Sequence, residues 1–243
     1  MIIRVVESKI NFKQKYYMKI TKYFALLIVV ILAGCNKITI STEDKKSIEE
    51  VQKFYGGYIE TSKGIETFNT KSNSYFEVII KNSNSINSQP QRVASKAANI
   101  AFMIFKNQSS DSYDVIKTTI ILSDGTKVSK SFSKNDLLQV ENLYPELEKL
   151  NSFLITKNYD GITEMFDPKF KPKEGVVENA LADFDKKFGD LKRIQFQGFE
   201  FIDDSVLGHT VLMRQVGERN NVFPFMNMAF DRNTKKLLNI EFP

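Results

Sequence analysis

The sequence is poor in the residues that most often build catalytic and metal centres. Its 243 residues include one cysteine, one histidine and no tryptophan. A single cysteine excludes an internal disulfide, and one histidine without a further thiol excludes the usual zinc cluster. A Ser-His-Asp triad would have to use His209, which follows Gly208 at a predicted strand start. A solvated histidine at a strand edge is the simpler interpretation.

Strong charge of one sign is also missing from most of the chain. The formal net charge is +5, but residues 1–34 contain six Lys or Arg residues and one acid. Removing these from the totals of 34 basic and 29 acidic residues leaves 28 of each kind in residues 35–243. A neutral chain gives no electrostatic reason to bind nucleic acid, so no nucleic-acid partner is predicted.

The apolar run over residues 24–33 is too short for a permanent transmembrane helix. Ten residues span about 15 Å as a helix, whereas a bilayer core is about 30 Å thick. Lys19 and Lys22 precede the run and small residues follow it, which is typical of a secretory signal. We interpret residues 18–34 as a signal peptide and residues 1–17 as a misassigned start or an extended basic region.

The end of the apolar run, Leu32-Ala33-Gly34-Cys35, resembles the lipobox of bacterial lipoproteins. The resemblance implies transfer of diacylglycerol to the Cys35 thiol and cleavage before Cys35. Membrane lipid would then be a partner, held through Cys35. Two or more acyl chains make such an anchor stable, while one chain binds marginally.

Residues 35–41 are predicted to form a lipidated tether that places the chain in the cell envelope. Asn36 is not an acidic retention signal, which favours the periplasmic face of the outer membrane in a Gram-negative organism.

Residues 42–136 predict a small α+β unit with the order α-β-β-α-β-β. Ser41 to Asp44 can cap a first helix, and Gly56-Gly57 ends it. The clearest helix covers residues 91–105. The pattern of β-branched and aromatic residues predicts strands over 58–69, 75–80, 113–122 and 126–132, with a turn at 71–74 and a polar loop at 82–89. The predicted inner face of the clearest helix comprises Val93, Ala97, Ile100, Ala101 and Ile104.

Residues 137–243 predict three helices followed by a four-stranded antiparallel meander. Pro145 should end the first helical stretch and open a second helix. Gly198 breaks the alternation of its strand, which predicts a β-bulge there. The shorter helices are expected over 162–166 and 174–188, and the strands over 191–201, 209–216, 221–230 and 237–242.

This element order resembles the nuclear-transport-factor-two-like, or cystatin-like, superfamily, as found in small domains of bacterial lipoproteins. Residues 150–166 and Phe188-Gly189-Asp190-Leu191 contribute to the resemblance, which covers residues 140–243. It implies helices packed on a curved sheet, often with a conical apolar pocket. The predicted fold class is therefore α+β, with a small four-stranded unit over 42–136 and a cystatin-like domain over 137–243.

The predicted strands of the second domain carry more apolar side chains than one sheet face needs. Most should be core, but some are candidates for a lipid-sized or peptide-sized cavity or a partner surface. These candidates are Phe196, Phe199, Met213, Phe223, Phe225 and Met228. Lysines 169, 171 and 173 form either a solvated basic loop or a contact with anionic lipid headgroups.

Acidic clusters offer no assignable metal site. Asp203-Asp204 is explained by turn chemistry, and Asp231-Arg232-Asn233 lacks the glycine and the distal glutamate of a calcium loop. In the ketosteroid isomerases of the resembled superfamily, a pocket carboxylate moves a proton and a tyrosine supports the oxyanion. The nearest candidates by element, none of them in a matching motif, are Tyr159, Asp160, Asp183 and Asp185.

The sequence favours a membrane-anchored, non-enzymatic binding or interaction module whose partner is an envelope protein or an apolar ligand. No catalytic, cofactor-binding or metal-binding residue is assigned. One alternative is a pocket enzyme of isomerase or dehydratase type, which predicts a buried carboxylate with a raised pKa. Another is an inhibitor or immunity lipoprotein, which predicts a rigid exposed loop.

Overall fold

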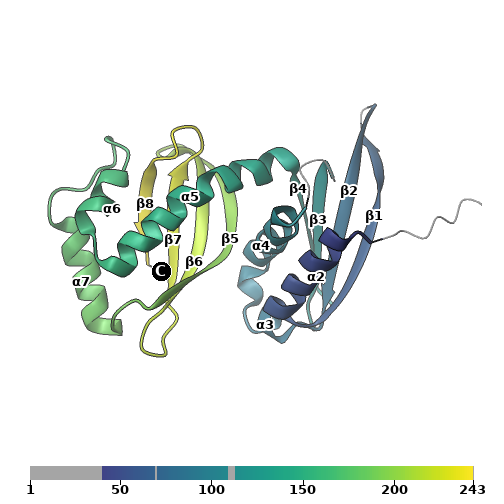
Figure 1. Ribbon diagram of the computed structural model, residues 1–243, viewed down its shortest axis with the longest axis horizontal. Helices are drawn as coiled ribbons and strands as arrows, with labels where there is room; N and C mark the ends of the chain where they lie inside the picture. Colours follow the sequence, from purple (N-terminus) through teal and green to yellow (C-terminus); the bar gives the residue numbers. More distant parts are fainter. Residues whose placement is uncertain (1–39, 69, 109–112, 243) are drawn as a thin grey trace, which may run out of the picture. The chain divides into compact units, whose positions relative to one another are not determined.

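The computed structural model describes residues 40–68, 70–108 and 113–242. Cys35, the lipobox and the predicted signal peptide lie outside these residues. Residues Ser41–Pro243 form one compact unit of mixed α and β structure. This unit contains two four-stranded sheets and confirms the predicted α+β class (Figure 1).

The first sheet is built from the predicted α-β-β-α-β-β order, with one short extra helix. Its strands follow the order β1-β2-β3-β4, in which β2 and β3 are parallel and the other neighbours are antiparallel. The elements are α2 (Thr42–Tyr55), β1 (Tyr58–Phe68), β2 (Lys71–Lys81), α3 (Asn84–Asn87), a 3-10 turn (Pro90–Arg92), α4 (Val93–Lys106), β3 (Val115–Ile121) and β4 (Lys127–Ser133).

The cap of α2 confirms its predicted start. The Ser41 hydroxyl accepts a hydrogen bond from the Asp44 backbone N–H, and the Asp44 carboxylate accepts one from the Ser41 N–H, both at 3.1 Å. Gly56 ends the helix, as predicted. These reciprocal bonds satisfy two backbone donors that a helix start would otherwise leave free.

The predicted turn at residues 71–74 is wrong. Strand β2 already begins at Lys71, which pairs with Phe68, and the chain reverses through Thr70 at φ 65°. The polar residues 71–74 thus extend the hairpin beyond the sheet core. Pairing with β1 satisfies their backbone groups, so the polar composition does not imply a turn.

Three helices connect the two sheets: α5 (Lys134–Thr156), α6 (Tyr159–Met165) and α7 (Val176–Phe188). The expected break at Pro145 is wrong, because α5 continues through it. A proline inside a helix costs about 3 kcal/mol. Burial on both sides of Pro145 outweighs this cost, since one apolar stripe runs along the whole helix. That stripe comprises Leu137, Val140, Leu143, Leu147, Leu150 and Leu154.

The second sheet is the predicted antiparallel meander. It comprises β5 (Arg193–Asp204), β6 (Gly208–Glu218), β7 (Phe225–Asp231) and β8 (Leu237–Glu241), in that order. The register shifts between Phe196 and Gly198, which confirms the bulge. Strand β7 begins later than predicted, because Arg219 and Val222 close a turn and Pro224 precedes the strand.

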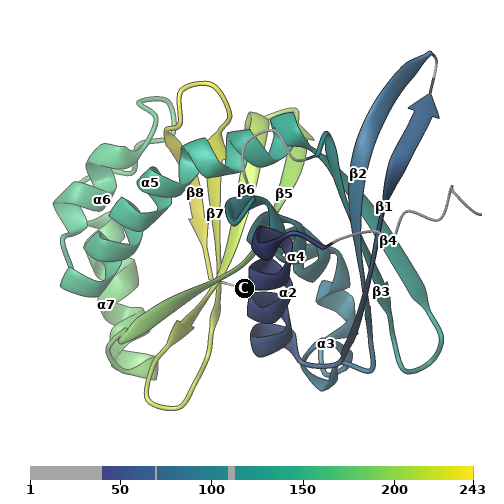
Figure 2. The ribbon, with the colours of Figure 1, turned by 45° about the vertical axis from the view of Figure 1, so that its right-hand side comes forward.

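Helix α4 belongs to the cores of both sheets (Figure 2). Ala97, Ile100, Ala101 and Ile104 of its predicted inner face are fully buried, and the helix packs on β3 and β4. On its other side, the Phe102 ring meets aromatic rings of β5. Contact of α4 with β5 therefore places the start of this helix beside the second sheet.

Candidate binding pockets

The six predicted pocket residues occupy different environments. Met213 and Met228 are opposite each other in β6 and β7 and are fully buried. Phe199 is buried and contacts the Phe132 ring. The other three are more accessible, and no single cavity collects all six. They are the half-buried Phe196 and Phe225, and Phe223, which is 55% exposed.

A polar pocket of about 430 Å³ opens where the first turn of α4 meets β5, β6 and β7. Its charged lining groups are Arg92, Arg214 and Glu200. Arg214 donates to a Glu200 carboxylate oxygen at 2.7 Å and to the Asn227 side-chain oxygen at 3.4 Å. We call this the arginine pocket. Its uncharged lining residues are Gln91, Ala94, Ser95 and Asn227.

Arg92 has a different environment from Arg214. Its guanidinium carbon lies 3.1 Å from the centroid of the Phe225 ring, so the predicted residue Phe225 serves as a stacking platform. Within the described part of the chain, no carboxylate or carbonyl accepts a hydrogen bond from this guanidinium. Burial and the neighbouring charge of Arg214 lower the pKa of Arg92.

Lys96 adds a third cation beside Arg92. Its ammonium group donates to the Ser85 carbonyl at 2.5 Å, and the residue is only 4% exposed. Burial, followed by the charge of Arg92, lowers the pKa of Lys96 to about 8. The pocket and its immediate surroundings thus hold more positive than negative charge.

A second pocket, of about 310 Å³, is mainly apolar and lies between α7 and β8. We call it the apolar pocket. Asp167 donates its backbone N–H to the Leu237 carbonyl at 2.8 Å, which fixes the α6–α7 loop to the start of β8. The lining residues are Phe166, Phe170, Pro172, Val176, Val177, Ala180, Leu181, Leu238, Asn239, Ile240 and Phe242.

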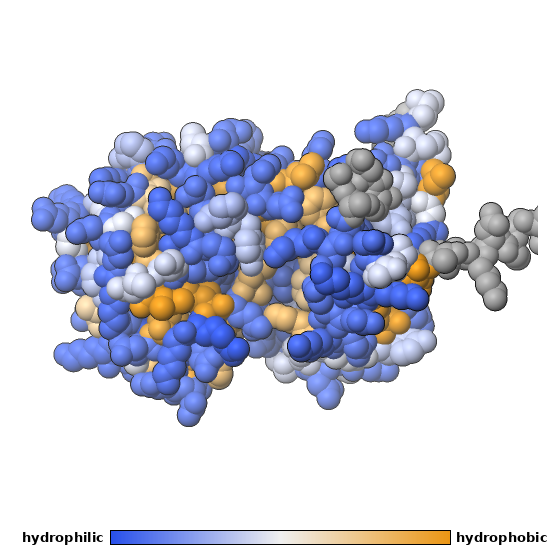
Figure 3. All heavy atoms as spheres, in the orientation of Figure 1, coloured by the Kyte–Doolittle hydropathy of each residue, from blue (hydrophilic) through white to orange (hydrophobic). Residues whose placement is uncertain are grey.

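The three predicted lysines are sequence neighbours of two residues that line the apolar pocket. Lysines 169, 171 and 173 are exposed, while Phe170 and Pro172 between them are half-buried and line the pocket. This loop therefore combines an apolar inner side with positive charge toward solvent. On the face shown in Figure 3, hydrophilic side chains predominate, with an apolar patch near the chain end marked C in Figure 1.

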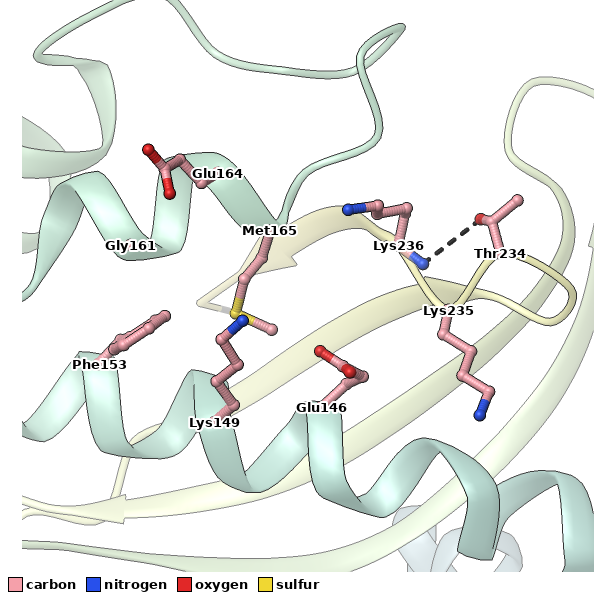
Figure 4. A pocket seen from close by; sticks show the side chains of 9 residues that line it. All are labelled: Glu146, Lys149, Phe153, Gly161, Glu164, Met165, Thr234, Lys235 and Lys236. Atoms are coloured by element: carbon pink, nitrogen blue, oxygen red, sulfur yellow. Dashed lines mark hydrogen bonds between the residues drawn. The ribbon is translucent and has the colours of Figure 1, made fainter.

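A third pocket, of about 260 Å³, lies between α5, α6 and the β7–β8 turn (Figure 4). Lys149, Lys235 and Lys236 share it with two glutamates, Glu146 and Glu164. The Lys236 backbone N–H donates to the Thr234 hydroxyl at 3.4 Å. Mixed charges on flexible side chains are typical of a solvated surface, and they give this pocket less selectivity for a ligand than the other two.

Two buried charges serve the fold. The Arg219 side chain, 2% exposed, pairs with Asp185 and donates to the Gly189 carbonyl at 2.6 Å. Asp44 receives the Lys63 ammonium at 2.6 Å. Burial would raise the pKa of Asp44, but hydrogen bonds from Lys63 and Ser41 outweigh it, so the pKa is lowered.

The remaining polar candidates lie at the surface or in ion pairs. His209 contacts Asp203 at 2.7 Å, with about 70% of each side chain exposed. Asp160 and Asp183 are exposed, and Asp185 pairs with Arg219. Every carboxylate with a shifted pKa in the described residues is shifted downward.

The residues after Phe230 form the predicted turn. The Asp231 carboxylate accepts hydrogen bonds from the backbone N–H groups of Asn233 and Thr234 at 2.9 and 2.7 Å. Across the described ranges, no cluster of His, Cys, Asp and Glu is arranged to hold a metal ion. No helix in these same ranges has the length and apolar character needed to cross a membrane.

Sequence reasoning missed the arginine pocket. Arg92 and Arg214 are far apart in the chain, and neither lies in a recognisable motif. The one sequence signal for this junction was Gly198, because the α4 backbone lies against its bulge. A Cβ added at Gly198 would lie 2.9 Å from the Ser95 hydroxyl oxygen and would overlap the Ser95 carbonyl oxygen.

Comparison with known proteins does not add an assignment. The chain matches no protein-family model, and neither curated proteins nor solved structures show significant similarity to it.

Proposed function

We propose that this protein is a lipid-anchored binding module of the bacterial cell envelope. Its apolar pocket holds an amphiphilic ligand that has an apolar chain and a negatively charged group. The observation that carries the proposal is the pocket itself, with apolar walls from α7 and β8 and with three exposed lysines in the loop that contributes Phe170 and Pro172 to its lining. Ligand pockets are usually concave and mainly apolar, with a few polar groups that orient the ligand. An amphiphile such as a fatty acid satisfies both features.

The N-terminal sequence supports the anchor. A basic segment, an apolar run and Leu32-Ala33-Gly34-Cys35 occur in the order of a lipoprotein signal. Helix α2 begins after the Ser41 cap. The tether between Cys35 and Ser41 spans at most about 20 Å, so the folded unit would remain close to the lipid surface.

We also propose that the second sheet and its helices form a cystatin-like domain. Support comes from the order of three helices followed by an antiparallel four-stranded meander. In this proposal the apolar pocket lies beside β8, at one edge of that sheet.

The intact mass of membrane-extracted protein tests the anchor. The expected species starts at Cys35 and carries diacylglyceryl or triacyl mass, and Cys35→Ser removes that mass. An unmodified chain that retains residues 1–34 would contradict the lipoprotein assignment.

Binding of a dansyl-labelled fatty acid tests the pocket. Ala180 lines it and is exposed, so Ala180→Trp should fill the pocket without disturbing the core. Ala182→Trp is the matched control, because Ala182 is exposed on α7 outside the pocket. We expect the first substitution to lower affinity at least tenfold and the second to have no effect. Equal affinity in both variants would refute an apolar ligand site here.

The lysines are tested by replacing residues 169, 171 and 173 together with glutamine. Affinity for the fatty acid should fall, while affinity for the corresponding dansyl-labelled alcohol should not change. A parallel loss for both ligands would mean that the lysines do not recognise the charged group.

A second candidate function, an inhibitor or immunity lipoprotein, is favoured by the β6–β7 loop. Val222 and Phe223, which follow the turn in this loop, are 42% and 55% exposed. Reciprocal backbone hydrogen bonds between Arg219 and Val222, of 2.9 and 2.6 Å, hold the loop in one shape. A photo-reactive residue at position 223 should then cross-link to one envelope protein. The same photo-reactive residue at position 65, which is exposed on β1, is the control and should not cross-link to that protein.

A further inference from the structure

We propose that the arginine pocket is a binding site for a small polar molecule carrying a carboxylate or phosphate group, recognised by Arg92 together with Arg214. This site lies on residues different from those of the apolar pocket, so the inference does not depend on the proposed function.

The pocket has the size and the lining of a ligand site. Its volume of about 430 Å³ falls within the range of about 300–1,000 Å³ typical of small-molecule pockets. Side-chain amides of Gln91 and Asn227 and the hydroxyl of Ser95 lie among its lining groups. Such groups can donate to or accept from the polar parts of a ligand.

Arg92 provides the recognition group. Its guanidinium lies over the Phe225 ring, and this contact limits the positions that the guanidinium can take. None of its N–H groups has an acceptor among the described residues, although a guanidinium has five such donors. A planar fork of N–H donors matches carboxylate and phosphate oxygens, and such charge-assisted bonds are stronger than neutral ones.

The environment of Arg214 shows that a carboxylate can bind in this pocket. Glu200 already supplies one carboxylate to it, at 2.7 Å, and the Glu200 side chain remains 55% exposed. One acid thus faces two arginines in the pocket lining, with Lys96 close to Arg92. The surplus positive charge favours a ligand that brings a negative charge of its own.

The walls of the pocket are held together. The Ser95 hydroxyl donates to the Gln197 carbonyl at 3.1 Å, which fixes the first turn of α4 to the β5 bulge. On the sheet side, the Asn227 amide donates to Glu241 at 3.2 Å. These bonds preorganise the polar groups, and a ligand then loses less free energy in ordering them.

Titration calorimetry on the full-length protein in neutral detergent tests the proposal. Inorganic phosphate and succinate are the two probes, and sodium chloride at the same ionic strength is the control for screening. We expect saturable binding of at least one probe. Succinate alone would identify a carboxylate site, phosphate alone would identify a phosphate site, and failure of both would overturn the proposal.

Three variants locate the binding. Arg92→Gln should weaken affinity roughly 10- to 100-fold, the usual effect of losing hydrogen bonds to a charged group. Arg193→Gln is the matched control, because the Arg193 side chain is 72% exposed and lies outside the pocket. Glu200→Gln should strengthen affinity several-fold, because it frees Arg214 from a competing carboxylate.

The gain expected for Glu200→Gln distinguishes ligand binding from damage to the fold, which could only weaken affinity. Circular dichroism of each variant checks folding directly. Unchanged affinity in Arg92→Gln, or weaker affinity in Glu200→Gln, would overturn the assignment of this pocket.

Discussion

Replacement of Gly198, a buried glycine in the bulge of β5, by alanine should strongly destabilise this protein. Gly198 has φ 127°, a backbone conformation that residues with a side chain rarely adopt. It also lies under the first turn of α4, where a Cβ would overlap the Ser95 carbonyl oxygen. The substitution therefore introduces both backbone strain at residue 198 and a collision of the new Cβ with the backbone of α4.

The expected cost has three parts. An alanine at positive φ costs about 1 kcal/mol. Overpacking against a backbone that cannot rotate away costs about 1–3 kcal/mol. Displacement of α4 also breaks the hydrogen bond from Ser95 to the Gln197 carbonyl, worth about 1 kcal/mol. We expect the free energy of unfolding to fall by roughly 3–5 kcal/mol.

Gly125→Ala is the matched control for this measurement. Gly125 also has positive φ, at 86°, but an added Cβ would have no neighbour within 4 Å. The control should thus cost only about 1 kcal/mol. With a urea m-value of about 2 kcal/mol/M, the two midpoints should differ by about 1–2 M. Equal shifts of the midpoint would refute the claim that α4 docks on the bulge.

Three further predictions concern buried charges and α5. Asp185→Ala should lower the free energy of unfolding by about 3–5 kcal/mol in a thermal melt, because it leaves the charge of the buried Arg219 unpaired. A loss below about 1 kcal/mol would mean that Arg219 is solvated. Pro145→Ala should raise stability by about 1–2 kcal/mol in urea, because it restores a helical N–H donor; a loss would show that the proline geometry is needed. Lys96 has its pKa lowered to about 8 in the folded protein, against 10.5 for the ordinary group. The unfolded chain therefore binds more protons between these values, and stability should rise as the pH increases from about 8 to about 10.5. Lys96→Met should flatten that rise, and an equally steep rise in the variant would assign it to another group.

Local sequence rules predicted the features that depend on neighbouring residues. The Ser41 cap is an example, because its hydrogen bonds join residues three apart. The bulge at Gly198 and the antiparallel meander follow from alternation and from turn residues in the same way. The strands of both sheets and most of the helices could therefore be placed along the sequence, whereas the parallel pairing of β2 with β3 was not predicted.

The errors arose where contacts far along the chain outweighed local preference. Pro145 has an intrinsic tendency to end a helix, but the leucines on both sides of it remain buried along one continuous stripe. Residues 71–74 have the composition of a turn, but they pair with β1. In both cases packing or pairing supplies more free energy than propensity removes.

The candidate sites were predictable only in part, for the same reason. The lysines at 169, 171 and 173 stood out in the sequence, but the pocket behind them required α7 and β8 to meet. The sequence marks Phe225 as an apolar side chain that is a candidate for a binding role, and this stays a prediction. Its stacking partner, Arg92, precedes it by more than a hundred residues, and no local pattern connects the two.

The burial of helix α4 explains where the arginine pocket lies. A helix with one apolar stripe covers one surface, whereas a helix that is apolar on nearly all sides is buried on all of them. Residues 96–102 of α4 are all buried, including Lys96 and Asn99. Because one sheet can cover only one side of such a helix, this burial requires further covering elements, and α2 and β5 provide them. The bulge at Gly198 is the place where β5 approaches the helix backbone. The packing of the buried helix on the bulged strand therefore explains why Arg92 and Arg214 converge at this junction, although they are far apart in the chain.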